Sequence, residues 1–254
     1  YAVATMDTKG SELSLVAQCL TKAGVAVKMV DAGTLEPPSI QPDVTREQIL
    51  QGRVVSREDR GTAVTTMGEA LTEFLVAEQE AGRVAGVIGI GGSGGTALIT
   101  AAMRALPIGL PKLMVSTVAR GNTASYVGCT DITMMYSVVD IAGLNTVSQR
   151  VLANAAHAMA GMVSHSFKPR ESRPCLGMTM FGVTTPCVTA VREKLEKKGY
   201  DCLVFHATGT GGRAMEQLVQ SGLIRGVLDI TTTEVADEVV GGVFPAGPDR
   251  FDTL

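Results

Sequence analysis

Tryptophan is absent from this sequence of 254 residues, and aromatic side chains of all kinds make up only 4%. Aromatic rings are the surfaces on which proteins stack unpaired bases, so their scarcity argues against a single-strand nucleic-acid binder. A basic surplus is lacking too, because the formal net charge is −3, whereas nucleic-acid-binding domains carry a positive excess. No apolar run is long enough to span a membrane. We therefore expect neither direct nucleic-acid binding nor a membrane location.

Cysteine is scarce as well, and its arrangement limits the chemistry further. The five cysteines form an odd set without a CxxC pair, which argues against a disulfide framework and a structural zinc site. The three histidines lack the spacing of metal ligands. These features predict a cytoplasmic protein without a metal site. The chain begins at Tyr1 with no preceding Met and stops at Leu254 in mid-element, so we expect a fragment of a longer protein.

Glycine, in contrast, is abundant, and five of its 29 copies fall within the seven positions 89–95. An apolar strand predicted over residues 84–90 enters this run, and a helix with apolar residues at 3.6-residue spacing follows at once. Glycines let a backbone come close to a ligand and adopt positive φ, and free N–H groups at a helix start attract anions. The run predicts a phosphate site, with an empty strand-to-helix turn as the alternative.

Familiar catalytic and nucleotide motifs fit this run poorly. No Lys-Ser/Thr pair follows, as a P-loop requires, and no acidic residue stands at the distance of a dinucleotide fingerprint. Residues 91–95 match the letters G-x-S-x-G of a hydrolase nucleophile turn, but no histidine partner can be assigned. The pattern thus favours a phosphate cradle over a serine nucleophile.

The spacing of apolar residues predicts alternating strands and helices along the chain. The first unit reads as a strand at 2–6, a loop at 7–10, a helix at 11–23 and a strand at 25–30. Further expected elements are helices at 45–51, 62–80 and 145–164 and strands at 112–117 and 132–135. Strands that alternate with helices in this way indicate parallel sheets covered by helices.

A polar segment with two prolines, residues 167–174, reads as a linker. After it the opening pattern returns, with a strand at 175–180, a helix at 186–198 and a strand at 202–205. The sequence therefore predicts an α/β protein of two Rossmann-like halves, each with a mainly parallel sheet flanked by helices. We expect residues 1–166 to form the first half, which carries the glycine-rich loop, and residues 175–254 to form a second half that is truncated at its C-terminus.

Ligands of such sheets bind beyond the carboxyl ends of the strands, where the loops of this chain are rich in Gly, Ser and Thr. Amides and hydroxyls suit phosphate and ribose oxygens, whereas a metal cage needs more carboxylates and histidines. Lys9 either provides a positive charge for a phosphate or is a solvated lysine that precedes a helix. A second glycine loop at 208–213 is either another anion site or an empty turn. The predicted nucleotide-binding residues are Asp7, Thr8, Lys9, Gly91, Gly92, Ser93, Gly94, Gly95, Thr96, Thr117, Gly209, Gly211, Gly212 and Arg213.

Four residues at strand ends are candidates for acid–base catalysis, namely His206, Asp229, Glu234 and Asp140. Three of them also have a structural explanation. His206 fits a structural histidine, Asp140 fits a turn cap, and Glu234 has the spacing of a capping box with Thr231, which is the interpretation we favour. Asp229 suits a contact with ribose or Mg²⁺. The sequence alone leaves the catalytic residues unknown.

Residues 86–96, 180–187 and 226–237 closely resemble segments of one family. This widespread bacterial and fungal family also includes the N-terminal domain of the tomato protein that confers resistance to tomato mosaic virus. The likeness runs along essentially the whole chain in the same order and is weakest in residues 31–59. It implies an ATP-binding α/β domain with the glycine-rich loop as its phosphate site, a homodimer, and a further C-terminal domain similar to a TIM barrel. It supplies no reaction.

Three functions are compatible with these observations. The first is nucleotide binding, with ATP preferred and its phosphates on residues 91–96, in an enzyme that uses ATP on a small metabolite. The second is a non-catalytic, ATP-dependent module that binds a protein, and the third is an enzyme that acts on a phosphorylated small molecule without ATP. The need for Mg²⁺ is open. An enzyme needs an acid or base in the cleft of the glycine loop, whereas a binding module would use these groups in caps and turns.

Overall fold

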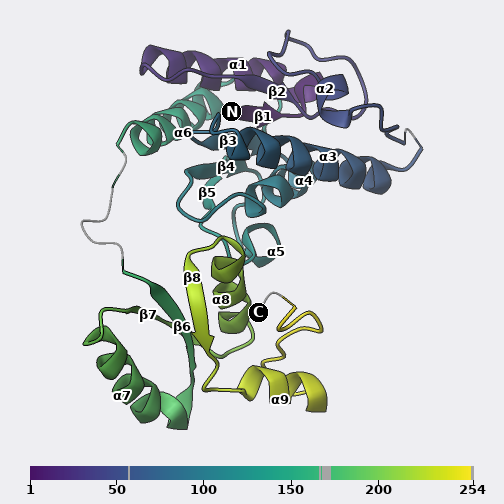
Figure 1. The fold of residues 1–254 in the computed structure, drawn as a ribbon. Helices are drawn as coiled ribbons and strands as arrows, with labels where there is room; N and C mark the ends of the chain where they lie inside the picture. The colour runs from purple at the N-terminus through teal and green to yellow at the C-terminus, as the bar shows by residue number, and fades with distance from the viewer. Residues whose placement is uncertain (57, 166, 168–172, 253–254) are drawn as a thin grey trace. The chain divides into compact units, whose positions relative to one another are not determined.

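Figure 1 shows the computed structural model of the chain, which describes residues 1–56, 58–165, 167 and 173–252. The chain divides after Phe167 into two compact units. Most of the predicted linker, residues 167–174, lies outside the described residues. Each unit has its own parallel sheet flanked by helices, which confirms the predicted fold class.

The first unit is built around a five-stranded parallel sheet. Its strands are β1 (Ala2–Ala4), β2 (Met29–Asp31), β3 (Val87–Gly91), β4 (Lys112–Ser116) and β5 (Thr133–Tyr136), in the order β2-β1-β3-β4-β5. β1 lies between β2 and β3, with Ala4 paired to Asp31 on one side and to Ile90 on the other. β1, β3 and β4 are buried along their whole length, as expected for a parallel sheet that is covered on both faces.

Helices cover both faces of this sheet (Figure 1). α1 (Met6–Lys22) and α6 (Thr146–Ser164) share one face, where Leu13 of α1 and Leu152 of α6 lie in one core with Ala4 of β1. The sequence starts α6 sharply, because Asn145 and Ser148 form a reciprocal capping box at its N-terminus.

The opposite face carries a second core, formed by α3 (Arg60–Glu80) and α4 (Ser93–Arg104). Leu71 of α3 and Leu98 of α4 belong to this core, together with Val87 of β3. Two short helices, α2 (Arg46–Leu50) and α5 (Ala124–Val127), complete the unit. The five strands are therefore doubly wound, with helices of both faces starting at the carboxyl edge of the sheet.

The second unit contains a smaller parallel sheet, with β6 (Cys175–Met180), β7 (Asp201–His206) and β8 (Ile224–Leu228) in the order β7-β6-β8. Its helices are the 3₁₀ turn η1 (Gly182–Thr184), α7 (Thr185–Glu196), α8 (Gly211–Gln220) and α9 (Thr233–Val240). This order repeats β2-β1-β3 of the first unit, in agreement with the internal repeat that the sequence indicated. The buried core is small, with Met178, Val188 and Cys202 at its centre.

The start of α1 differs most from the sequence prediction. Residues 7–10 were expected to form a loop, but α1 begins at Met6 and continues through a kink at Lys9, whose backbone is non-helical (φ −131°, ψ 23°). Two helical pieces therefore meet at this residue, and Asp7 and Thr8 lie in the first turn of the helix.

The chain reverses its direction of winding between β1 and β3. From β1 it crosses to β2 on one side, and it later returns to β3 on the other side. Ligands of open α/β sheets bind outside the carboxyl ends of the strands at such a switch point. The turns that follow β1 and β3 are consequently the first place to look for a site. Among the described residues, none of the helices combines the length and apolarity needed to cross a membrane.

Candidate functional site

The glycine-rich segment forms an abrupt turn from β3 into α4. Gly91 ends the strand, Gly92 is the N-cap of the helix, and Ser93, Gly94 and Gly95 make its first turn. Within the described part of the chain, no side chain caps this helix. The N–H groups of a first helical turn have no partner inside the helix, and together with the helix dipole they attract anions. The amides of this turn thus have no side-chain cap, and anion binding there stays a prediction.

The glycines of this turn serve close packing, since neither Gly91, Gly92, Gly94 nor Gly95 has a positive φ. A Cβ on Gly91 would lie 2.9 Å from the carbonyl carbon of Gly95, so only glycine lets the strand end so close to the helix. Cβ atoms on Gly92 or Gly94 would meet no neighbour nearer than 3.8 Å. The absence of side chains there leaves open space in front of the helix.

That space is a cavity of about 400 Å³ at the carboxyl ends of β1, β3 and β4. It is within the size range of small-molecule sites. Its wall consists mainly of backbone, hydroxyl groups and charged side chains, contributed by Thr5, Asp7, Thr8, Lys9, Thr34, Leu35, Arg60, Val64, Gly92, Ser93, Gly94, Gly95, Leu98, Thr117 and Asp140. The structure therefore brings together eight of the predicted nucleotide-binding residues and one predicted catalytic candidate.

Two predicted residues of the glycine loop do not line the cavity. Gly91 is buried at the end of β3, where it provides the close approach described above. Thr96 is fully buried, and its hydroxyl lies 2.6 Å from that of Ser116, the last residue of β4. This hydroxyl pair joins α4 to the sheet below the turn. The side chain of Thr96 thus has a structural role.

The charged groups on the β1 side of the cavity make contacts with their surroundings. The ammonium of Lys9 donates to the carbonyl of Ile141 over 2.6 Å, and the amide of Ile141 donates to Asp140 over 2.8 Å. Asp7 accepts from the amide of Leu35. A lysine has three donors and a carboxylate several acceptor positions, so each group still has capacity for a ligand. Asp140 both caps its turn and lines the cavity.

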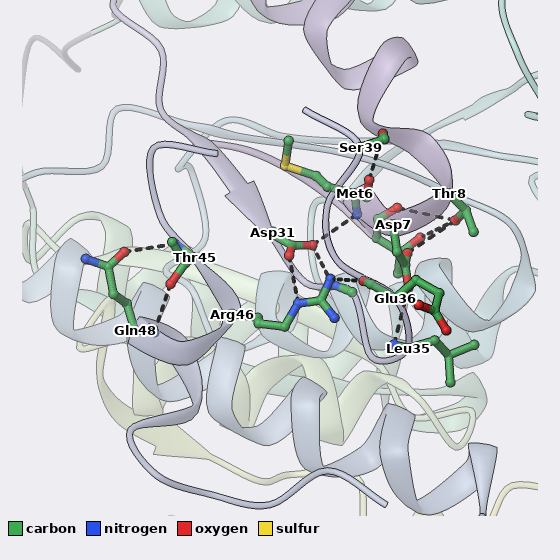
Figure 2. Close-up of polar contacts among 12 residues, drawn as sticks. Met6, Asp7, Thr8, Asp31, Leu35, Glu36, Ser39, Thr45, Arg46 and Gln48 are labelled. Carbon is green, nitrogen blue, oxygen red and sulfur yellow. Dashed lines mark hydrogen bonds and ion pairs between the residues drawn. The ribbon is translucent and has the colours of Figure 1, made fainter. Parts of the chain in front are cut away.

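A buried carboxylate that no sequence motif predicted, Asp31, organises this side of the cavity. Figure 2 shows Asp31, at the end of β2, between the amide of Met6 and the guanidinium of Arg46. The carboxylate is fully buried and accepts from Met6 N at 3.1 Å, Gly33 N at 2.8 Å and Arg46 Nε at 2.8 Å. It fixes the first turn of α1 against the loop that contains Leu35. The available signal for this ion pair was an acidic residue, Asp31, directly after a predicted strand, and a basic residue, Arg46, near the start of the next predicted helix.

The glycine loop of the second unit is occupied by a side chain of the same chain. The amides of Gly209 and Gly212 donate to the carboxylate of Glu234, over 2.7 Å and 3.0 Å. The Arg213 guanidinium turns back onto the carbonyl of Gly209. Gly211 is part of the same turn, and a Cβ there would overlap the carbonyl of His206. The predicted second anion site is therefore closed in this structure.

Glu234 also does not form the predicted capping box. The N-cap of α9 is Thr232, without a side-chain hydrogen bond, and the hydroxyl of Thr231 donates to the carbonyl of Thr179 in β6. Glu234 is 2% exposed and points away from its own helix start toward the glycine turn. Glu234 therefore does not cap its own helix but binds the amides of the glycine turn at Gly209 and Gly212.

Asp229 belongs to a buried charge cluster in the second unit. Its carboxylate accepts from the Thr179 hydroxyl at 2.5 Å and from Arg250 at 3.0 Å, and Arg250 also binds Glu216. The Arg250 side chain is 4% exposed. Nε of Arg250 is buried without a hydrogen-bond partner among the described residues. Removal of one charge from such a cluster leaves the others buried and uncompensated. This arrangement accounts for Asp229 without a ligand.

The remaining catalytic candidate, His206, ends β7, where it pairs with Met180 of β6. Its side chain is exposed and makes an edge-to-face contact with Phe181, which in turn contacts Phe244. His206, Asp229 and Glu234 all belong to the second unit, whereas Asp140 belongs to the first. Within the described ranges, no group of three or more His, Cys, Asp or Glu residues could hold a metal ion.

Two profiles of one family together match nearly the whole chain. The N-terminal domain of an uncharacterised protein family (UPF0261) matches residues 1–168, and the C-terminal domain of that family matches residues 173–254. These limits coincide with the two units of the structure to within a few residues. The match therefore assigns each compact unit to a separate family domain.

Alignments of this chain with relatives agree with the profiles. A UPF0261 protein of Rhizobium meliloti is 54% identical over 260 residues, and one of Clostridium tetani is 47% identical over 257 residues. The ToMV resistance protein Tm-1(GCR237) of Solanum lycopersicum is 46% identical over 281 residues. The alignments cover 98–100% of this chain but 64%, 63% and 37% of these relatives, respectively. The chain belongs to the UPF0261 family.

Proposed function

We propose that the first unit binds a nucleotide, with ATP preferred, in the cavity between the turns that follow β1 and β3. The observation that carries this proposal is the uncapped first turn of α4, which faces a cavity of about 400 Å³. Phosphate oxygens accept hydrogen bonds from such a turn and are favoured there by the helix dipole. The phosphates would lie on Gly92, Ser93, Gly94 and Gly95.

The rest of the cavity suits the other parts of a nucleotide. Hydroxyl groups of Thr8 and Thr117 lie in its wall as partners for ribose or phosphate oxygens. Leu35 and Leu98 add apolar surface for a base. Lys9 contributes a positive charge near the first turn of α1. The combination of one anion-binding turn, hydroxyl groups and apolar side chains is typical of small-molecule sites.

Acidic groups in the same cavity favour an enzyme that uses ATP on a small metabolite. Asp7 and Asp140 both line the cavity of the glycine turn, whereas Asp229 and Glu234 are engaged within the second unit. A carboxylate next to bound phosphates is suited to proton transfer or to a Mg²⁺ ion, which is commonly held by one or two carboxylates and the phosphates themselves. A protein-binding module without catalysis remains the alternative.

Calorimetric titration of the 254-residue chain with ATP, ADP, NAD and sugar phosphates, each with and without Mg²⁺, tests this proposal. We expect ATP to bind most tightly. Binding of sugar phosphates without any nucleotide would replace the proposal with an enzyme that acts on phosphorylated small molecules. Turnover of bound ATP in the presence of cell metabolites would identify an enzyme, and its absence would favour the binding module.

A matched pair of variants locates the phosphates. Gly92→Val combined with Gly94→Val fills the space in front of α4 with methyl groups and should abolish ATP binding. Gly161→Val is the control, since Gly161 is exposed in α6, has free space around its Cβ position and does not line the cavity. Thermal melting would show that both proteins fold. Unchanged ATP affinity in the double variant would remove the turn from the site.

The proposed assembly is a homodimer, as the resemblance to the family implied. Ala155, Ala156 and Ala160 of α6 are buried in the core that α6 shares with α1, so these three residues are not available to a dimer interface. Sedimentation at low protein concentration tests the oligomeric state, and a monomer would contradict the proposed dimer.

A further inference from the structure

A second cation, which sequence analysis passed over, lies beside the glycine turn. Arg60 is the first residue of α3, and its side chain lines the cavity. A Cβ on Gly94 would lie 3.8 Å from Nη2 of Arg60, so the guanidinium is next to the first turn of α4. Val64, one helical turn further along α3, is equally close to that position. Arg60 is thus part of the wall in front of the uncapped amides.

Helix packing holds Arg60 in this place. α3 and α4 cross closely at Gly68, where a Cβ would lie 3.7 Å from Cα of Leu98. Asp59 caps α3 by accepting from the amide of Gly61 at 2.8 Å and from the hydroxyl of Thr62. These two contacts, the hydroxyl first, lower the pKa of Asp59. The neighbouring carboxylate is therefore occupied by the helix start.

The guanidinium of Arg60 is available to a ligand. In the ranges that the structure describes, it has neither a hydrogen-bond nor an ion-pair partner, and the residue is exposed. Lys9, in contrast, already donates to the carbonyl of Ile141. A guanidinium offers a planar pair of donors that matches two oxygens of one phosphate, whereas a lysine acts as a point charge. Arg60 is the better phosphate partner by geometry and by availability.

We propose that Arg60 is the phosphate-binding side chain of this cavity and acts together with the amides of Ser93 and Gly94. This proposal rests on the proposed function, because it specifies how the same site recognises its ligand. It identifies the ligand class as a phosphate ester or anhydride, one phosphate of which accepts hydrogen bonds from both the helix N-terminus and the guanidinium. The cation thus comes from α3, on the other side of the turn from Lys9.

Titrations of the wild-type chain and of Arg60→Gln with ATP, AMP, inorganic phosphate and adenosine test this assignment. Charge-assisted hydrogen bonds of this kind correspond to about a tenfold to hundredfold change in affinity. We expect Arg60→Gln to weaken ATP binding by that factor and to leave adenosine binding unchanged. The pattern among ATP, AMP and inorganic phosphate shows whether a single phosphate suffices. Arg60→Lys keeps the charge but not the planar donor pair, so its ATP affinity should lie between those of the wild type and Arg60→Gln.

Arg53→Gln is the matched control. It removes the same charge from an arginine that pairs with Glu73 and does not line the cavity, so ATP affinity should stay at the wild-type value. Equal losses in both variants would show a general charge effect and overturn the assignment. Undiminished ATP binding by a folded Arg60→Gln protein would also overturn it, while the proposed function would stand. Absence of nucleotide binding by the wild-type chain would refute both.

Discussion

The two glycine turns of this molecule look alike in sequence but differ in what faces them. Each follows a strand and starts a helix, α4 in the first unit and α8 in the second. The amides of the first turn face a cavity, whereas those of Gly209 and Gly212 already bind the carboxylate of Glu234. A glycine turn is therefore open to an external anion only where no acidic side chain of the same fold reaches its amides. That condition depends on residues far away in the sequence.

The two sheets also differ in the side-chain hydrogen bonds near the carboxyl ends of the strands β6 and β1. In the second unit, the hydroxyl of Thr179, one residue before the end of β6, binds Asp229, and the hydroxyls of Thr184 and Thr231 lie 2.6 Å apart. These bonds close the gap between the turns that follow β6 and β8. In the first unit, β1 ends in Ala4, which has no polar group to make such a bond. The hydroxyl bonds of the second unit thus have no counterpart in the side chain of Ala4.

The largest effect on stability should come from adding a methyl group to the closed turn, which is the glycine turn of the second unit whose amides bind Glu234. In Gly211→Ala the new Cβ overlaps the carbonyl of His206, which is backbone and cannot move aside. We expect a loss of more than about 4 kcal/mol in the free energy of unfolding of the second unit. Hydrogen exchange resolved by segment would detect it as loss of protection in residues 201–228. The open turn provides the counterpart, since Gly94→Ala places its Cβ 3.8 Å from the nearest atoms and should melt like the wild type.

Similar destabilisation by both substitutions would contradict the contrast between a closed and an open turn. Equal tolerance of both would contradict it as well, because the second unit would then have unused space at Gly211. The pair is informative because each substitution adds one methyl group to the first turn of a helix.

The next largest effect concerns the charge cluster that supports the closed turn. Arg250→Met leaves the carboxylates of Glu216 and Asp229 buried without their shared cation. Removing one partner of a buried ion pair costs about 3–5 kcal/mol. Chemical denaturation followed by circular dichroism would measure the loss. Arg225→Met, at an exposed position of β8, is the control and should change the free energy of unfolding by less than about 0.5 kcal/mol.

The smallest of the three effects concerns the occupant of the closed turn itself. Glu234→Gln keeps the shape but removes the charge that the amides of Gly209 and Gly212 bind, and the loss should be roughly 1.5–3 kcal/mol. Glu238→Gln, which weakens one exposed contact from the same helix, is the control. Denaturant midpoints of the two variants provide the comparison. Equal midpoints would show that Glu234 is not the anion on which the turn depends.

Local patterns were sufficient to predict the fold. The strand predicted at 175–180 is β6 without any shift, and α3 and α6 end where their apolar periodicity ends. Periodicity and glycine stops are properties of short windows, so a single sequence reveals them. The strand β3 begins at Val87, three residues later than predicted, and it ends at Gly91, one residue later than predicted.

Contacts between distant residues could not be predicted in this way. Arg46 reaches Asp31 across 15 positions, and Glu234 reaches Gly209 across 25. Arg60 approaches Gly94 only because two helices pack together. No spacing rule connects these partners, since the packing of the whole unit brings them together. The sequence therefore showed the two glycine turns, but it showed neither the approach of Arg60 to the first turn nor that of Glu234 to the second.

The carboxylate of Asp31 has a consequence for how a ligand would enter. Its hydrogen bonds join the start of α1, the loop at Gly33 and the side chain of Arg46 beside the cavity. Ordering a flexible wall during binding would cost conformational entropy, on the order of 0.5–1.5 kcal/mol for each long side chain that becomes fixed. A wall that is preorganised avoids that loss. Association should consequently proceed with little rearrangement on this side, so that selectivity arises from the contacts themselves.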